Sequence, residues 1–172
     1  MITGELKNKI DGIWNIFWSG GITNPLTVIE QITYLMFIKI LDDNEIRKIN
    51  TAMLLETEPA GLVFDAEHQD CRWSNFTKLG DPDAMFKTVR DRVFPFITGT
   101  GDESEKGLSG GKDTAFARFM KNAYFDIRSP KMLSSVVQKI EDLDLENKDI
   151  TASYDHTGKE GHSDPGRGAC NI

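Results

Sequence analysis

The chain has 172 residues, of which 39% are hydrophobic and 27% charged, an ordinary balance for one soluble globular domain. A formal net charge of −7 argues against binding nucleic acid through overall charge, although a local basic face stays open. Cys71 and Cys170 stand far apart without paired spacing, so the sequence indicates neither a disulfide framework nor a zinc site and fits a reducing cytoplasm.

The first predicted element is an amphipathic helix over residues 5–18, because its apolar residues recur at three- and four-residue spacings. The pair Gly20-Gly21 ends it. Its aromatic side chains Trp14, Phe17 and Trp18 are interpreted as core residues rather than as a platform for base stacking.

The longest apolar-rich run, residues 22–44, predicts the central helix of the fold. Asn24 can cap its first turn and Pro25 suits its first position. The charged Lys39 and the Glu30-Gln31 pair interrupt the run, which excludes a membrane span. A further helical piece, residues 51–58, is ended by Pro59. The apolar residues cover most sides of the helix and leave a narrow polar stripe of Thr27, Glu30, Gln31 and Asp42.

Residues 62–82 predict loop with a one-turn helix, after which Asp81-Pro82 opens a helix that Pro95 ends. Residues 98–113 are rich in glycine and charge, which predicts a mobile surface loop. Asp113 or Thr114 then caps a short helix with Phe116, Phe119 and Met120 facing inward.

Ser129-Pro130 begins the last clear helix, whose apolar residues recur at helical spacing to Leu143. Beyond residue 150 the periodicity is lost, and residues 151–172 are predicted to be a disordered tail. No stretch alternates as a strand would. The fold class is therefore all-α: a single helical bundle domain of about five or six helices over residues 1–150.

Motifs for chemistry are weak. Gly99-Thr100-Gly101 lacks the flanking strand of a nucleotide-binding turn, and Gly110-Gly111-Lys112 lacks the other residues of a phosphate loop. His68 and Cys71 have metal-ligand spacing but no second pair, so a structural histidine is favoured. Asp42-Asp43 is interpreted as a solvated face, and the sequence presents no active site or cofactor site.

Basic residues concentrate in the second half: residues 83–131 carry nine Lys or Arg against seven Asp or Glu. Such an excess usually marks a solvated face, but Lys and Arg also make the phosphate contacts of non-specific DNA binding. The candidate DNA-binding residues are Lys87, Arg90, Arg92, Arg118, Lys121, Arg128 and Lys131.

The chain resembles the N-terminal helical domain of the methylation (HsdM-type) subunit of type I restriction-modification systems, which are DNA adenine methyltransferases. The resemblance covers residues 3–150. It is carried by Ile13-Trp14, the stretch ITNPLTVIEQITYLMFIKILDD, the segment CRWSNF at residues 71–76, and the closing helix of residues 130–145.

The resemblance implies a non-catalytic module that helps to hold DNA and contacts the specificity and restriction subunits. In the family a separate catalytic domain binds S-adenosylmethionine and methylates adenine N6. The Asn-Pro-Pro-Tyr/Phe motif of that domain is absent here, since the Asn24-Pro25 pair is followed by Leu26. We therefore expect no methyltransferase activity from this chain alone, no bound cofactor, and a tail over residues 151–172 that reflects truncation or a shifted reading frame.

Two functions stay open. The first is DNA-backbone contact together with subunit assembly for DNA methylation. The alternative is a protein-protein interaction module that docks on the catalytic domain or the specificity subunit and does not touch DNA.

Overall fold

The computed structural model describes residues 4–99, 120 and 122–155, and every regular element in these ranges is helical. The all-α prediction is thus confirmed. The loop predicted at residues 98–113 begins later than expected, since Thr98 still belongs to helix α5. Its part from residue 100, the predicted cap at Asp113 or Thr114, the core candidates Phe116 and Phe119, and the tail from residue 156 lie outside the described residues. In chain order the elements are α1 (Gly4–Ser19), α2 (Pro25–Leu54), η1 (Gln69–Cys71), α3 (Trp73–Phe76), α4 (Pro82–Thr88), η2 (Val89–Val93), α5 (Phe94–Thr98) and α7 (Pro130–Asp155).

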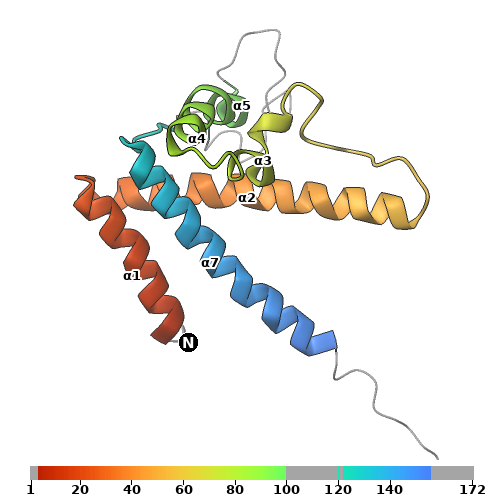
Figure 1. The fold of residues 1–172 in the computed structure, drawn as a ribbon, viewed down its shortest axis with the longest axis horizontal. Helices are drawn as coiled ribbons and strands as arrows, with labels where there is room; N and C mark the ends of the chain where they lie inside the picture. Colours follow the sequence, from red (N-terminus) through yellow and green to blue (C-terminus); the bar gives the residue numbers. More distant parts are fainter. Residues whose placement is uncertain (1–3, 100–119, 121, 156–172) are drawn as a thin grey trace, which may run out of the picture.

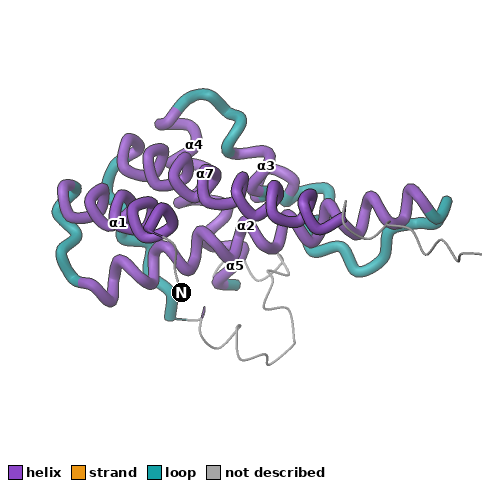
Figure 2. Tube along the Cα trace, turned by 90° about the horizontal axis from the view of Figure 1, so that it is seen from below, coloured by secondary structure: helices purple, strands orange, loops and turns teal. Residues whose placement is uncertain are grey.

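Helix α2 is the axis of the molecule. In Figure 1 it runs horizontally, with α7 crossing it, α1 extending below its N-terminal end, and α4 and α5 above it. Helix α7 packs against both α1 and α4, so it joins the two groups. Figure 2 shows the same arrangement from below, with the C-terminal end of α2 reaching past the other helices.

The start of α2 confirms the predicted cap: the Asn24 side chain accepts a hydrogen bond from the Leu26 N–H at 3.0 Å, and Pro25 takes the first helical position. The helix then continues without interruption to Leu54, so the separate piece predicted at residues 51–58 is wrong. The predicted outer polar stripe is also partly wrong. Gln31 and Asp42 are buried, whereas the apolar residues Leu26, Ile29 and Ile40 are exposed.

Helix α1 confirms the predicted amphipathic segment and presents Ile13 and Phe17 to the core. Trp14 is half-buried, but Trp18 is 58% exposed, so its assignment to the core is wrong. Successive residues of a helix point about 100° apart, and Trp18 follows directly after the buried Phe17. Its ring therefore falls off the packed face.

The end of α1 lies close against the start of α7. A Cβ added at Gly20 would meet Met132 Cε at 1.8 Å, so a larger residue there would displace the end of the Met132 side chain. Helix α7 begins as predicted, with Ser129 Oγ accepting a hydrogen bond from the Met132 N–H at 3.2 Å. It continues past residue 150 to Asp155, into the segment predicted to be tail.

The helix opened by Asp81 and Pro82 does not end at Pro95, as the sequence had predicted. Pro95 has no N–H, and its ring would press on the carbonyl four residues earlier in a regular α-helix. The helix widens instead into one π-helical turn, η2, in which the Phe94 N–H donates a hydrogen bond to the carbonyl of Val89, five residues earlier. Helix α5 then runs to Thr98 and ends at Gly99, whose φ of 70° is left-handed.

Candidate nucleic-acid interface

The described members of the predicted DNA-binding set are all exposed. Lys87 lies on α4, Arg90 and Arg92 lie on η2, and Arg128 and Lys131 lie just before and within the first turn of α7. Arg118 and Lys121 lie outside the described residues.

Arg90 already has an anionic partner next to it in the chain. Its Nε and Nη2 donate to the two carboxylate oxygens of Asp91 at 2.6 and 3.0 Å, and its guanidinium lies 5.5 Å from the centre of the Phe86 ring. These hydrogen bonds hold the pKa of Asp91 below its usual value. Both side chains of the pair are exposed to solvent, so the pair contributes little to stability.

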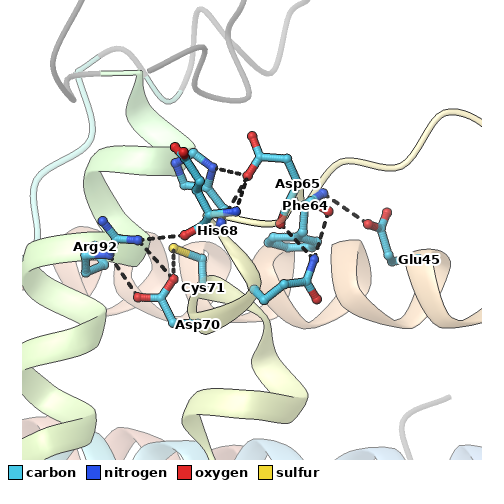
Figure 3. A network of polar contacts seen from close by, with 9 residues as sticks. Glu45, Phe64, Asp65, His68, Asp70, Cys71 and Arg92 are labelled. Carbon is cyan, nitrogen blue, oxygen red and sulfur yellow. Dashed lines mark hydrogen bonds and ion pairs between the residues drawn. The ribbon is translucent and has the colours of Figure 1, made fainter. Parts of the chain in front are cut away.

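Arg92 points in a different direction, toward η1. It donates to both carboxylate oxygens of Asp70 at 2.8 and 3.2 Å and to the carbonyl of Glu67 at 2.8 Å (Figure 3). The hydrogen bonds from Arg92 lower the pKa of Asp70. Arg92 thus ties η2 to the loop that follows α2, a structural role that the sequence did not suggest.

Lys131, in the first turn of α7, lies on the side of α1, and Arg128 comes just before that helix. Arg128 pairs with Asp126 at 3.4 Å, and Lys131 lines a hollow of about 310 Å³ together with Ser19 and Gly20. Helix α4 instead packs beside Ser134 and Gln138 of α7. The described basic residues therefore come from three neighbourhoods: Lys87 with Arg90, Arg92 at η1, and Arg128 with Lys131.

The polar residues that the structure does bring together lie on α2, and sequence reasoning missed them. Gln31 donates to the carbonyl of Tyr124 at 2.7 Å and accepts from the N–H of Asp126 at 3.0 Å. It thereby anchors the segment that leads into α7.

Asp42 anchors a second segment, the turn that precedes α3. Its two oxygens accept from Arg72 Nε at 2.6 Å and from the Ser74 N–H at 2.7 Å. The side chain of Asp42 is 2% exposed, so its interpretation as part of a solvated face is wrong. The partners lie thirty residues and more along the chain, beyond the reach of any local pattern.

Glu45 anchors a third segment, the loop that returns from the end of α2. Its two oxygens accept from the Val63 N–H at 2.8 Å and the Phe64 N–H at 3.0 Å. Figure 3 shows the bond to Phe64. Lys39 is also buried. Its Nζ lies 3.7 Å from a carboxylate oxygen of Asp43 and 3.7 Å from one of Glu141. It also faces the Trp73 ring, whose Nε1 donates a hydrogen bond to Glu141.

A sequence signal for these anchors did exist. Their positions continue the alternating three- and four-residue spacing of the buried face of α2, which reads Val28, Gln31, Leu35, Ile38, Asp42 and Glu45. Polar residues in phase with a buried apolar face are hydrogen-bonded inside the fold.

The histidine and glycine motifs have structural explanations. His68 is buried, its Nδ1 lies 2.6 Å from Asp65 Oδ1, and its ring stacks on Phe96 at 4.5 Å. The hydrogen bond with His68 lowers the pKa of Asp65. No group of three potential metal ligands occurs in the described part of the chain. Gly99 serves as the left-handed end of α5, and the motif at residues 110–112 lies outside the described ranges.

None of the described helices is both long and apolar enough to cross a lipid bilayer. The family model described as the HsdM N-terminal domain matches residues 6–140, which is most of the chain. No curated protein and no solved structure gives a significant match. The chain therefore belongs to the HsdM N-terminal domain family and carries the N-terminal domain of the methylation subunit of a type I restriction-modification system.

Proposed function

We propose that this domain serves adenine-N6 methylation of DNA, in the cytoplasm, as a non-catalytic module that contacts the DNA backbone and helps to assemble the specificity and restriction subunits with the methylation subunit. Membership of the family supports a role within a type I restriction-modification system. In the family, S-adenosylmethionine binding and methyl transfer belong to the catalytic domain. This chain lacks the Asn-Pro-Pro-Tyr/Phe motif of that domain, so the proposal assigns neither step to it.

The observation that supports the DNA contact is the exposure of Lys87 on α4, Arg90 on η2 and Lys131 on α7, because α4 packs against both η2 and α7. Arg128 is exposed just before α7. Lys131 lies in the first turn of a long helix, where the peptide dipoles and N–H groups favour anions. The contacts are to phosphates, so the binding carries little sequence preference.

A salt titration of binding to an arbitrary duplex and to single-stranded DNA tests this proposal. Each neutralised phosphate contributes a slope of about −0.9 in log K against log salt on duplex DNA. We expect Lys87→Gln or Lys131→Gln to reduce that slope by about 1, whereas Lys7→Gln on α1 leaves it unchanged. Binding that is absent at low salt, or insensitive to salt, contradicts the DNA contact.

A second candidate is a protein-protein interaction module that docks on the catalytic domain or the specificity subunit without DNA contact. It is favoured by the pairing of Arg90, Arg92 and Arg128 with carboxylates and by the net charge of −7. If the glutamine variants leave assembly of the methyltransferase complex and its DNA affinity unchanged, this second function holds.

A further inference from the structure

Helix α1 carries two tryptophans on one flank. Trp14 and Trp18 are four residues apart, so their side chains are neighbours along the helix. Trp14 is half-buried against the core, whereas Trp18 is 58% exposed. Successive residues turn by about 100°, so this flank faces away from the side on which Gly12 and Ile16 meet α7. Figure 1 shows α1 at one edge of the molecule.

The two indole rings border a hollow of about 390 Å³. The described residues that line it are Asp11, Trp14, Asn15 and Trp18, and we call these four the indole hollow. They offer two aromatic faces, one carboxylate and one amide. The Asp11 side chain is 52% exposed, and its carboxylate pairs with Lys7 Nζ at 3.0 Å, one turn earlier on the helix.

Each of these groups attracts positive charge. An aromatic ring is negative on its faces, a carboxylate is an anion, and an amide oxygen accepts hydrogen bonds. A guanidinium is planar, donates five N–H groups and accepts none, so it can stack on an indole while it donates to a carboxylate. The net charge of −7 also favours the approach of a cationic partner. The lining therefore selects an arginine side chain.

The same lining argues against the other ligands of an exposed aromatic pair. A platform that stacks nucleic-acid bases needs basic residues along the backbone of the strand, and the described lining of the indole hollow contains neither Lys nor Arg. The Asp11 carboxylate would repel the phosphates. An aliphatic partner would take that carboxylate out of water without offering it a hydrogen bond, which is unfavourable.

We propose that the indole hollow binds an arginine side chain presented by a partner polypeptide. The guanidinium stacks on the Trp18 ring and donates to the Asp11 carboxylate and to the side-chain oxygen of Asn15. Lys7 leaves Asp11 as the arginine arrives, and since their ion pair is exposed it contributes little to stability. The inference goes beyond the proposed function, because the site lies on the flank away from α7 and its ligand is a cation instead of DNA.

Two-dimensional NMR of the full chain tests the proposal, because the indole N–H of each of the three tryptophans gives its own signal. The probes are the blocked tripeptide Gly-Arg-Gly and the same peptide with citrulline, which has the shape of arginine without its charge. We expect Gly-Arg-Gly to shift the signals of Trp14 and Trp18 with a dissociation constant on the order of 1 mM. The citrulline peptide should bind at least about 10-fold more weakly. Trp73 is buried, so its signal serves as the internal reference.

Three variants separate the contributions to binding of Gly-Arg-Gly. Asp11→Asn should weaken it by at least about 5-fold, because the carboxylate is lost. Trp18→Leu keeps an apolar side chain but loses the ring, and should weaken binding by about 2–5-fold. Lys7→Gln should tighten binding by about 2–5-fold, because it removes the competing ammonium.

Tyr124→Leu is the matched control for the loss of an aromatic ring. Tyr124 is also exposed, at 73%, but lies outside the indole hollow, so its replacement should leave the binding unchanged. Circular dichroism establishes that all four variants are folded.

Four results would overturn the proposal. The first is no shift of the Trp14 and Trp18 signals by Gly-Arg-Gly up to about 50 mM. The second is equal binding of the citrulline peptide or equal binding by Trp18→Leu, which would make the hollow a plain apolar patch. The third is weaker binding by Lys7→Gln. The fourth is a shift of the Trp18 signal by adenosine monophosphate where Gly-Arg-Gly gives none, which would make the rings a base-stacking platform. None of these results bears on the salt slope of Lys87→Gln or Lys131→Gln, so the two proposals fail separately.

Discussion

The two halves of helix α2 differ in how polarity relates to burial. In the half from Val28 to Glu45, polar side chains are buried and every one of Gln31, Asp42 and Glu45 accepts or donates hydrogen bonds to a different distant segment. In the half that ends at Leu54, large apolar side chains face solvent. One helix thus serves as an internal scaffold along one part of its length and as an external surface along the other.

The difference follows from what covers each half. The first half is covered by loops and short elements whose backbone N–H and C=O groups need partners, and charged or amide side chains on α2 supply them. The second half extends beyond that cover. Apolar residues there have no core to enter, so they face solvent.

The largest expected effect comes from removing a buried anchor. Asp42→Ala leaves the guanidinium of Arg72 and the Ser74 N–H without their acceptor in the interior, and should lower the free energy of unfolding by about 3–5 kcal/mol. Urea denaturation followed by circular dichroism measures this loss.

The double variant Asp42→Leu with Arg72→Met is the control for the anchor. It removes both charges and should recover part of the loss, because an apolar pair of similar size needs no hydrogen bonds. If Asp42→Ala costs less than about 1 kcal/mol, as an exposed substitution would, then the buried half of α2 is not held by this carboxylate.

Local signals in the sequence were enough to predict much of the fold. The Asn24 cap, the Ser129-Pro130 start and the spacing of Ile13 and Phe17 are all short-range features, and the structure confirms each of them. They could not show that Asp42 reaches Arg72, because that contact depends on how the chain returns to α2. The sequence also did not predict that the helix continues through Pro95. Proline is a clear signal for a helix end, whereas a π-turn that accommodates it has no comparable sequence signal.

For the basic residues, the sequence predicted the residue types but not how the fold arranges them. The sequence named Lys87, Arg90, Arg92, Arg128 and Lys131 by type alone, and the structure divides them among three neighbourhoods. Whether they contact DNA stays a prediction. The sequence shows that a residue is an arginine, but not whether its guanidinium pairs with a carboxylate or with a phosphate.

Glu45→Gln should cost less than Asp42→Ala, about 1–3 kcal/mol. The amide keeps one acceptor oxygen, so one of the N–H groups of Val63 and Phe64 loses its partner. Hydrogen exchange should show faster opening of the returning loop than of α1. Unchanged protection at Val63 and Phe64 would show that the loop is held by other contacts.

A smaller effect is expected at the exposed pair of Arg92 and Asp70. The pKa of Asp70 is held below its ordinary value of 3.8, so the pair contributes stability above that value and loses it as the pH falls through the lowered pKa. Both side chains are nearly half exposed, which limits the contribution to less than about 1 kcal/mol after solvent screening.

The pH dependence of Arg92→Gln tests this pair. The stability difference between wild type and the variant should be constant above about pH 5 and shrink toward about pH 3, measured by thermal unfolding at each pH. Arg47→Gln, at the far end of α2, should show no such convergence. A difference for Arg92→Gln that persists unchanged in acid would mean that Arg92 acts through the carbonyl of Glu67 rather than through Asp70.

The smallest effect on folding is expected at the apolar end of the same helix. Leu54→Asn removes a side chain that is 85% exposed, so the free energy of unfolding of the isolated copy should change by no more than about 0.5 kcal/mol. A loss of several kcal/mol would mean that Leu54 is packed within its own chain. A small change, beside the large loss at Asp42, would establish that burial along α2 depends on position relative to the covering loops and not on the polarity of the residue.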